Sequence, residues 1–136
     1  MNRYCFDLDH TLCDPPYLED EKRWDYFAAV PYRDRIEVVN KLWEEGHYII
    51  VETGRGCDSK INHYEKTYDQ LRSWGLKFHI LRTGVKFSAT YYIDDNGYFV
   101  KRENRSRGAT ALASDDFTTA ESSTYPVAST TWQSAS

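Results

Sequence analysis

The stretch Tyr4-Cys5-Phe6-Asp7-Leu8-Asp9-His10-Thr11-Leu12 joins an apolar run to two carboxylates that are separated by one residue. If the apolar run is a strand, the chain leaves the sheet at Asp7, and side chains at i and i+2 of an extended segment share a face. We therefore expect Asp7 and Asp9 to converge at the carboxyl end of a strand, where open α/β sheets bind ligands. Two close carboxylates repel each other unless a cation or a proton intervenes, so the pair indicates Mg²⁺ binding or acid–base chemistry. The alternative is a plain turn in which Asp and Thr cap loop amides.

The composition is that of one globular domain. The chain has 136 residues, of which 40% are hydrophobic, and its net charge is −4. The negative charge disfavours nonspecific nucleic-acid binding, although nucleic acid as a local substrate stays open. The cysteines, Cys5, Cys13 and Cys57, are odd in number and lack CxxC spacing, which favours reduced thiols in a cytoplasmic protein. We expect Cys5 to lie inside a buried strand. No apolar run reaches membrane-spanning length, so no membrane partner is expected.

Short apolar runs alternate with segments of helical spacing, which predicts βαβ units and a mainly parallel sheet. The expected strands cover residues 4–8, 48–51, 78–81 and 90–93, with 97–101 as a short edge strand. The expected helices cover residues 34–45 and 60–74, and a further helix is expected over 18–30. The fold class is therefore α/β.

The composition changes after about residue 106, where Ser, Thr and Ala become dominant. This change predicts a folded domain over residues 1–106 and a loosely ordered tail over 107–136. The segments between Thr11 and Thr53 and between Thr53 and Asp94 are short and must supply crossover helices, so no large cap domain is expected. Such an open site accepts a large substrate or a small one completed by a neighbouring subunit, which is compatible with a homo-oligomer.

Polar side chains follow the predicted strands in order. Thr53 follows the second strand, Lys86 lies on the approach to the fourth, and Asp94 and Asp95 end it. Because the carboxyl ends of parallel strands meet at one edge, these residues are expected to join Asp7 there. The set would supply carboxylates for a cation, and a hydroxyl and an ammonium group for a phosphate. Phosphoryl transfer to a carboxylate requires such groups.

These motifs together resemble the haloacid dehalogenase (HAD) phosphatase superfamily. Asp7-Leu8-Asp9-His10-Thr11 is similar to its DxDxT signature, and Thr53 in Ile-Ile-Val-Glu-Thr-Gly-Arg is similar to its second motif. Lys86 and the segment Tyr92-Ile93-Asp94-Asp95 match the remaining motifs, and the resemblance covers roughly residues 4–100. In more detail the chain resembles the small capless phosphatases of capsule biosynthesis. The resemblance implies a three-layer α/β/α sandwich with a Rossmann-like, HAD-like sheet.

The resemblance also implies a role for each matching residue. Asp7 would be the nucleophile that forms an aspartyl-phosphate, and Asp9 would protonate the leaving oxygen and then activate water. Mg²⁺ would be held by Asp94, the Asp7 carboxylate and the Asp9 backbone carbonyl, with Asp95 in support. The residues expected to bind the phosphate are Thr53, Gly54, Arg55 and Lys86.

The roles assigned to Lys86 and Arg55 each have an alternative. Lys86 lacks the Gly-Lys-Pro context that is usual in the family, and Lys60 is its rival as the phosphate-binding lysine. Arg55 is expected either to contact the substrate or to pair with the acids of the site. The predicted function is a Mg²⁺-dependent phosphomonoester hydrolase that acts on a small phosphorylated substrate, a sugar phosphate or a nucleotide. The alternatives are a nucleic-acid end phosphatase and a non-catalytic regulatory module that binds phosphate or metal.

Overall fold

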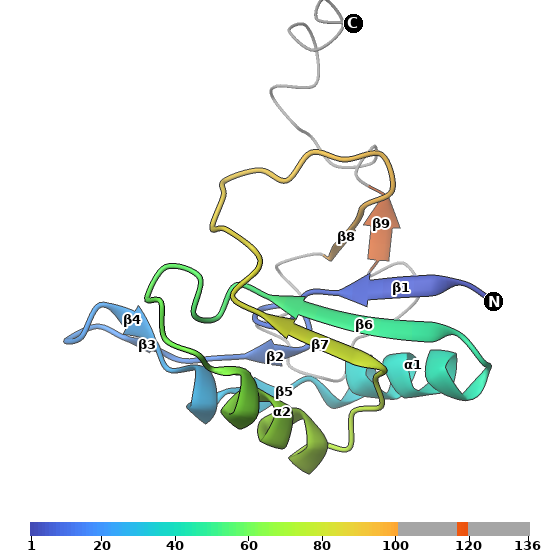
Figure 1. Cartoon of the computed structure of the whole chain (residues 1–136), viewed down its shortest axis with the longest axis horizontal. Helices are drawn as coiled ribbons and strands as arrows, with labels where there is room; N and C mark the ends of the chain where they lie inside the picture. The colour runs from blue at the N-terminus through green and yellow to red at the C-terminus, as the bar shows by residue number, and fades with distance from the viewer. Residues whose placement is uncertain (101–116, 120–136) are drawn as a thin grey trace, which may run out of the picture.

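The structure of the chain is a computed structural model, and it describes residues 1–100 and 117–119. Its centre is a parallel sheet of three strands in the order β1-β6-β7 (Figure 1). The strands are β1 (Arg3–Phe6), β6 (Tyr48–Thr53) and β7 (Ile80–Thr83). The predicted parallel α/β architecture is confirmed, and β6 runs two residues beyond the predicted end, as far as Thr53.

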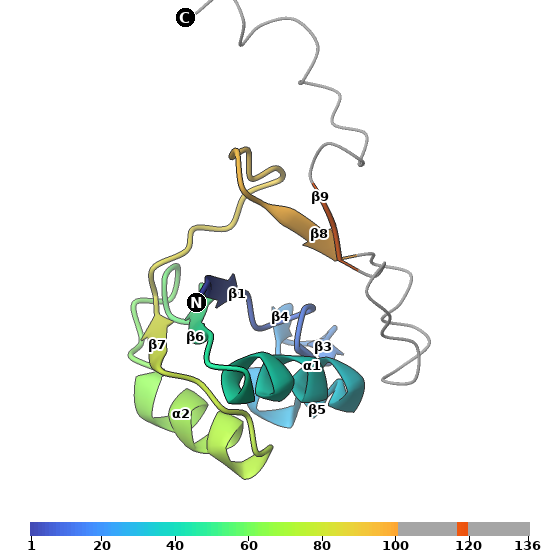
Figure 2. The same ribbon diagram turned by 90° about the vertical axis from the view of Figure 1, so that its right-hand side faces the viewer.

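Two helices pack against this sheet, namely α1 (Arg33–Glu44) and α2 (Tyr64–Ser73). Both predicted helices in these regions are confirmed, but α2 begins later than expected. Lys60 has a positive φ of 62°, and the Asn62 side chain accepts the Tyr64 backbone N–H, so the chain turns before the helix starts. Both helices lie on the same face of the sheet (Figure 2), which gives two layers within the described residues.

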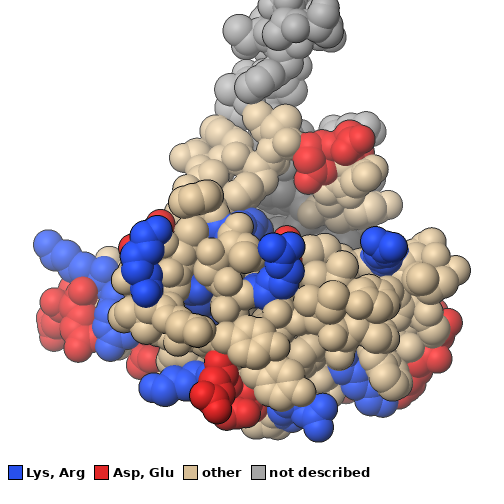
Figure 3. Space-filling model, viewed as in Figure 1, with Lys and Arg blue, Asp and Glu red and all other residues tan. Residues whose placement is uncertain are grey.

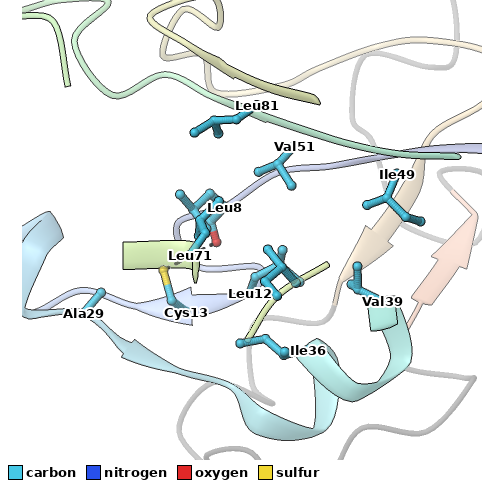
Figure 4. Packing of buried hydrophobic residues seen from close by; sticks show 11 residues of the cluster. Leu8, Leu12, Cys13, Ala29, Ile36, Val39, Ile49, Val51, Leu71 and Leu81 are labelled. Atoms are coloured by element: carbon cyan, nitrogen blue, oxygen red, sulfur yellow. Dashed lines mark hydrogen bonds between the residues drawn. The ribbon is translucent and has the colours of Figure 1, made fainter. Parts of the chain in front are cut away.

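The hydrophobic core lies between the sheet and the two helices (Figure 4). Strand β6 contributes Ile49 and Val51, which are fully buried, while its alternate residues are half-buried. This alternation follows from the two-residue period of a strand that is covered on one face. Cys5 is exposed, contrary to the prediction of a buried strand, because β1 has no helix over its other face in the described residues.

The predicted helix over residues 18–30 is wrong. The segment instead contains β3 (Tyr17–Leu18), which pairs with β4 (Arg23–Trp24), then the 3₁₀-helix η1 (Tyr26–Ala28) and β5 (Val30–Pro31), which pairs with β2 (Cys13–Asp14). Trp24 packs edge-on against Tyr17 across the hairpin. The hairpin turns at Lys22, whose φ is 53°, a conformation that an α-helix excludes.

The predicted strand over residues 90–93 is also not formed, and the segment runs as an extended loop away from the sheet (Figure 1). Local hydrogen bonds hold it, since the Tyr92 hydroxyl donates to the Phe87 carbonyl and the Asn96 N–H donates to Asp94. The predicted edge strand is β8 (Tyr98–Val100), which pairs antiparallel with β9 (Phe117–Thr119).

Strand β9 falls within the segment that the sequence predicts as a tail, and the predicted domain boundary at residue 106 lies outside the described residues. No large cap domain is inserted into the part of the chain that the structure describes. Among the described helices, none combines the length and the apolar character that crossing a bilayer would need.

Candidate active site

The acidic loop after β1 turns back on itself and presents two carboxylates. Leu8 is fully buried in the core, and its carbonyl accepts the N–H groups of Thr11 and Leu12 at 3.1 and 2.8 Å. His10 completes the turn with a φ of 66°. Because Leu8 points inward, its neighbours on either side, Asp7 and Asp9, point the other way, as the alternation of an extended segment requires.

Asp7 is the more accessible of the two carboxylates, with a side chain that is 36% exposed. Its Oδ1 lies 3.6 Å from the Lys86 Nζ, and its Oδ2 accepts a hydrogen bond from the Thr11 Oγ1 at 3.4 Å. Burial raises the pKa of Asp7 above its ordinary value, and the positive charge of Lys86 opposes that rise. The Lys86 ammonium also lies 4.4 Å from the centre of the Tyr92 ring. Lys86 therefore faces Asp7, as the predicted phosphate-binding lysine should.

Asp9 is held by a buried guanidinium group. The Arg55 Nε donates to Asp9 Oδ2 at 2.9 Å, and the Arg55 Nη2 donates to Oδ1 at 2.8 Å. Arg55 has no exposed side-chain surface, whereas the Asp9 side chain is 14% exposed. Such two-point pairing sets the direction of both carboxylate oxygens. Of the two alternatives for Arg55, the structure shows the pairing with an acid of the site.

Three partners from other segments fix the Arg55 side chain. Its Nη1 donates to Gln70 Oε1 at 2.7 Å and to Thr67 Oγ1 at 3.3 Å, and its Nη2 donates to the Tyr26 carbonyl. Gln70 in turn donates to the same carbonyl at 2.9 Å. The sequence did not single out Thr67 as a site residue, although Thr67 and Gln70 are three residues apart on α2 and so share a face of the helix.

The end of β6 brings the second motif next to Lys86. Thr53 is buried, and its Oγ1 accepts the Arg55 backbone N–H at 3.2 Å. Gly54 packs so closely that a Cβ added there would lie 2.5 Å from the Lys86 carbonyl oxygen. Because real Cβ atoms do not approach an oxygen so closely, a side chain at Gly54 would push the Lys86 segment away. The glycine therefore sets the position of the lysine.

The predicted metal ligands are not gathered by this arrangement. Asp94 and Asp95 are exposed, and the Asp94 Oδ1 accepts the Asn96 N–H at 2.6 Å in a local turn. Residues 1–100 and 117–119 contain no group of three His, Cys, Asp or Glu side chains that could hold a metal ion. The charges of Asp7 and Asp9 are balanced by Lys86 and Arg55 instead. As placed here, the residues do not fit a Mg²⁺ site.

Lys60, the rival of Lys86, lies elsewhere. It lines a cavity between the loops that follow β6 and β7, and Asp7 is not among the residues that line this cavity. The contact between Lys86 and Asp7 therefore favours Lys86 as the lysine of the acidic site.

Comparison with known proteins identifies a fold and no family. No protein-family model matches the chain, and no curated protein matches it. The chain is similar in structure to an MCSG target from Vibrio cholerae whose crystal structure is known, with a TM-score of 0.60 and 20% sequence identity. The match covers 85% of this chain and 94% of that one. At this level of identity the likeness concerns the fold alone.

Proposed function

We propose that the chain is a phosphomonoester hydrolase in which Asp7 is the nucleophile. The observation that carries this proposal is the partly exposed Asp7 carboxylate, which lies at the carboxyl end of a parallel strand and faces the Lys86 ammonium at 3.6 Å. A carboxylate beside a cation, at the edge where α/β sheets bind ligands, is the arrangement that attack on a phosphate needs. The sequence resemblance to HAD phosphatases supports the same reaction.

In the first step, an Asp7 oxygen attacks the phosphorus atom, and the bond between phosphorus and the leaving oxygen breaks. Asp9, in its protonated form, gives its proton to that oxygen, and the product alcohol departs. Lys86 and the Thr11 hydroxyl, which both contact Asp7, supply positive charge and a hydrogen-bond donor beside the transferred group.

In the second step, water attacks the phosphorus atom of the aspartyl-phosphate. Asp9 accepts a proton from the water, the bond between phosphorus and Asp7 breaks, and inorganic phosphate leaves. Arg55 does not touch the reacting atoms in this scheme. It positions Asp9 through the two hydrogen bonds to its carboxylate.

The Mg²⁺ dependence stays a prediction of the sequence. Neither step is assigned to a metal ion. Asp7 is paired with Lys86 and Asp9 with Arg55, and Asp94 does not form a metal-binding group with them. Sugar phosphates and nucleotides are the proposed substrate class. The third layer of the sandwich, and thus the full HAD-like fold, likewise remains a proposal that rests on the resemblance.

One observation favours a second candidate function. Because Asp94 is not gathered with Asp7 and Asp9, the described residues pair carboxylates with Lys86 and Arg55 and form no group of acids that could hold a metal ion. A phosphate-binding module without turnover would have this arrangement.

Hydrolysis of an aryl phosphate distinguishes the two candidates. The wild-type chain, assayed with para-nitrophenyl phosphate and Mg²⁺, is expected to release phosphate, and Asp7→Asn is expected to lose turnover while it still binds inorganic phosphate. Lys22→Gln, on the β3–β4 hairpin, is the control variant, and it is expected to keep the turnover of the wild type. Phosphate binding without turnover by the wild type would favour the binding module.

A further inference from the structure

A cavity of about 550 Å³ lies at the same edge of the sheet as the acidic loop, between the loops that follow β6 and β7. Its exposed charged lining residues are Lys60 and Arg82, and its polar lining includes Asn62, Tyr64 and Thr83. Arg55 also lines it, but the Arg55 guanidinium is buried and paired with Asp9. In the space-filling view, Lys and Arg atoms gather over these loops in the left half of the face (Figure 3). Of the residues assigned to phosphoryl transfer, only Arg55, which positions Asp9, is among those that line this cavity.

The lining has positive charge that is free to meet a ligand. No described lining residue is acidic. Within the described residues Lys60 makes no ion pair and no side-chain hydrogen bond. Arg82 pairs with Glu52 at 3.3 Å, but the Arg82 side chain is 57% exposed and the Glu52 side chain is 34% exposed. Solvent-exposed ion pairs contribute little to stability, about 0–1 kcal/mol, so the pair holds Arg82 only weakly.

The walls of the cavity depend on unusual backbone positions. Gly56 has a φ of +87°, and a Cβ there would lie 2.2 Å from the Ile61 carbonyl oxygen. Gly84, on the opposite loop, has a φ of +69°. Lys60 also has a positive φ, which is uncommon for a residue with a side chain. Both loops therefore contain residues with positive φ, a backbone conformation that residues other than glycine rarely adopt.

Two connections link the cavity to the acidic site. Val85 lines the cavity, and the next residue, Lys86, contacts Asp7. Arg55 lines the cavity and also holds Asp9. The cavity lies between the loops that follow β6 and β7, which are one and two strand positions from β1, and the spacing of neighbouring strands makes this separation roughly 5–10 Å. A hexose or nucleoside that carries two phosphates can span such a distance.

We propose that this cavity binds a second anionic group of the substrate, so that the preferred substrates are sugars or nucleosides with two phosphate groups. One phosphate lies at Asp7 and is transferred, while the other lies between Lys60 and Arg82. The proposal rests on the proposed phosphatase function for its catalytic part, but binding in the cavity can be measured without turnover.

Matched substrates test the kinetic part. We compare kcat/KM for fructose 1,6-bisphosphate and fructose 6-phosphate, and for adenosine 3′,5′-bisphosphate and adenosine 5′-monophosphate. The wild type is expected to prefer the bisphosphate of at least one pair. Lys60→Gln and Arg82→Gln are each expected to reduce that preference about tenfold, as the loss of one charge-assisted hydrogen bond would. Lys22→Gln, which also changes an exposed lysine at positive φ, is expected to leave the preference unchanged.

Calorimetry separates this proposal from the proposed function. In an Asp7→Asn background the same four compounds are titrated with and without Lys60→Gln. If the wild type hydrolyses no phosphate but Lys60→Gln weakens binding of a bisphosphate, the phosphatase assignment fails and the cavity assignment stands. The cavity assignment is overturned if the protein prefers the bisphosphate in neither of the two substrate pairs. It is also overturned if Lys60→Gln and Lys22→Gln reduce the preference for the bisphosphate equally.

Discussion

Arg55 and Asp9 form a two-point ion pair in which Nε and Nη2 of the arginine each donate to a different carboxylate oxygen, at 2.9 and 2.8 Å. The two residues are 46 positions apart in the sequence. The pair joins the loop after β1 to the loop after β6, and Gln70 extends it to α2. One buried guanidinium therefore connects the acidic loop to the rest of the fold.

This connection predicts a large difference between two arginine substitutions. Arg55→Met should lower the free energy of unfolding by about 3–5 kcal/mol, because it leaves a largely buried Asp9 carboxylate without its partner. Arg82→Met breaks the exposed pair with Glu52 and should cost no more than about 1 kcal/mol. Urea denaturation of both variants measures the difference. Equal losses would mean that Arg55 is not the connecting residue described here.

Gly54 is predicted to control activity through the position of Lys86. Gly54→Ala places a Cβ against the Lys86 carbonyl oxygen and should displace the lysine from Asp7, which lowers kcat/KM for an aryl phosphate roughly tenfold or more. Gly46→Ala is the matched control. A Cβ at Gly46 meets nothing within 4 Å, although its φ of +92° costs about 1–2 kcal/mol of stability. Normal activity in Gly54→Ala would show that this close approach does not matter.

The raised pKa of Asp7 predicts a stability effect whose sign depends on pH. Since burial raises the folded-state pKa above the ordinary value of 3.8, the stability that depends on protonated Asp7 is fully present below pH 3.8. That stability is lost as the pH rises through the folded-state pKa. Asp7→Asn cannot ionise, so it should have a higher Tm than the wild type at pH 7 and no advantage below pH 3.8. Thermal unfolding over pH 3–8 tests this, and a lower Tm for the variant at pH 7 would contradict it.

Asp94 carries the predicted requirement for Mg²⁺. The sequence resemblance predicts that hydrolysis stops in excess chelator and returns when Mg²⁺ is added. It also predicts that Asp94→Asn raises the Mg²⁺ concentration needed for activity by roughly 10- to 100-fold. Asp95→Asn serves as the comparison, because Asp95 is expected only to support the site. Unchanged activity in excess chelator would contradict the Mg²⁺ requirement. It would show that Asp7 and Asp9, paired with Lys86 and Arg55, act without a metal ion.

Local patterns in the sequence predicted the three parallel strands, both helices and the position of the acidic loop. Apolar runs that end in polar residues identify strand ends without knowledge of the partner strand, and Asp7 and Thr53 both follow such runs. The helix predicted over residues 18–30 failed because Trp24 and Phe27 have helical spacing, while cross-hairpin packing of Trp24 on Tyr17 decides the structure.

Other features depend on contacts that no local pattern contains. The pairing of Asp9 with Arg55 joins distant segments, so the sequence left open whether the arginine meets an acid or a substrate. Asp94 was expected to lie beside Asp7 at the end of a strand over residues 90–93. A strand of four residues forms only where a neighbouring strand offers hydrogen bonds. In the structure the local bonds of Tyr92 and Asp94 hold that segment in a loop.

The central claim is that phosphate passes through Asp7, and chemical trapping tests it most directly. The wild-type chain is mixed with an aryl phosphate, quenched within milliseconds and reduced with borohydride, which converts an aspartyl-phosphate to homoserine. Peptide mass spectrometry is expected to find homoserine at position 7 and unmodified aspartate at position 9, with no modification in Asp7→Asn. Homoserine at another aspartate, or turnover with no trapped residue and near-normal rates in Asp7→Asn, would contradict the account.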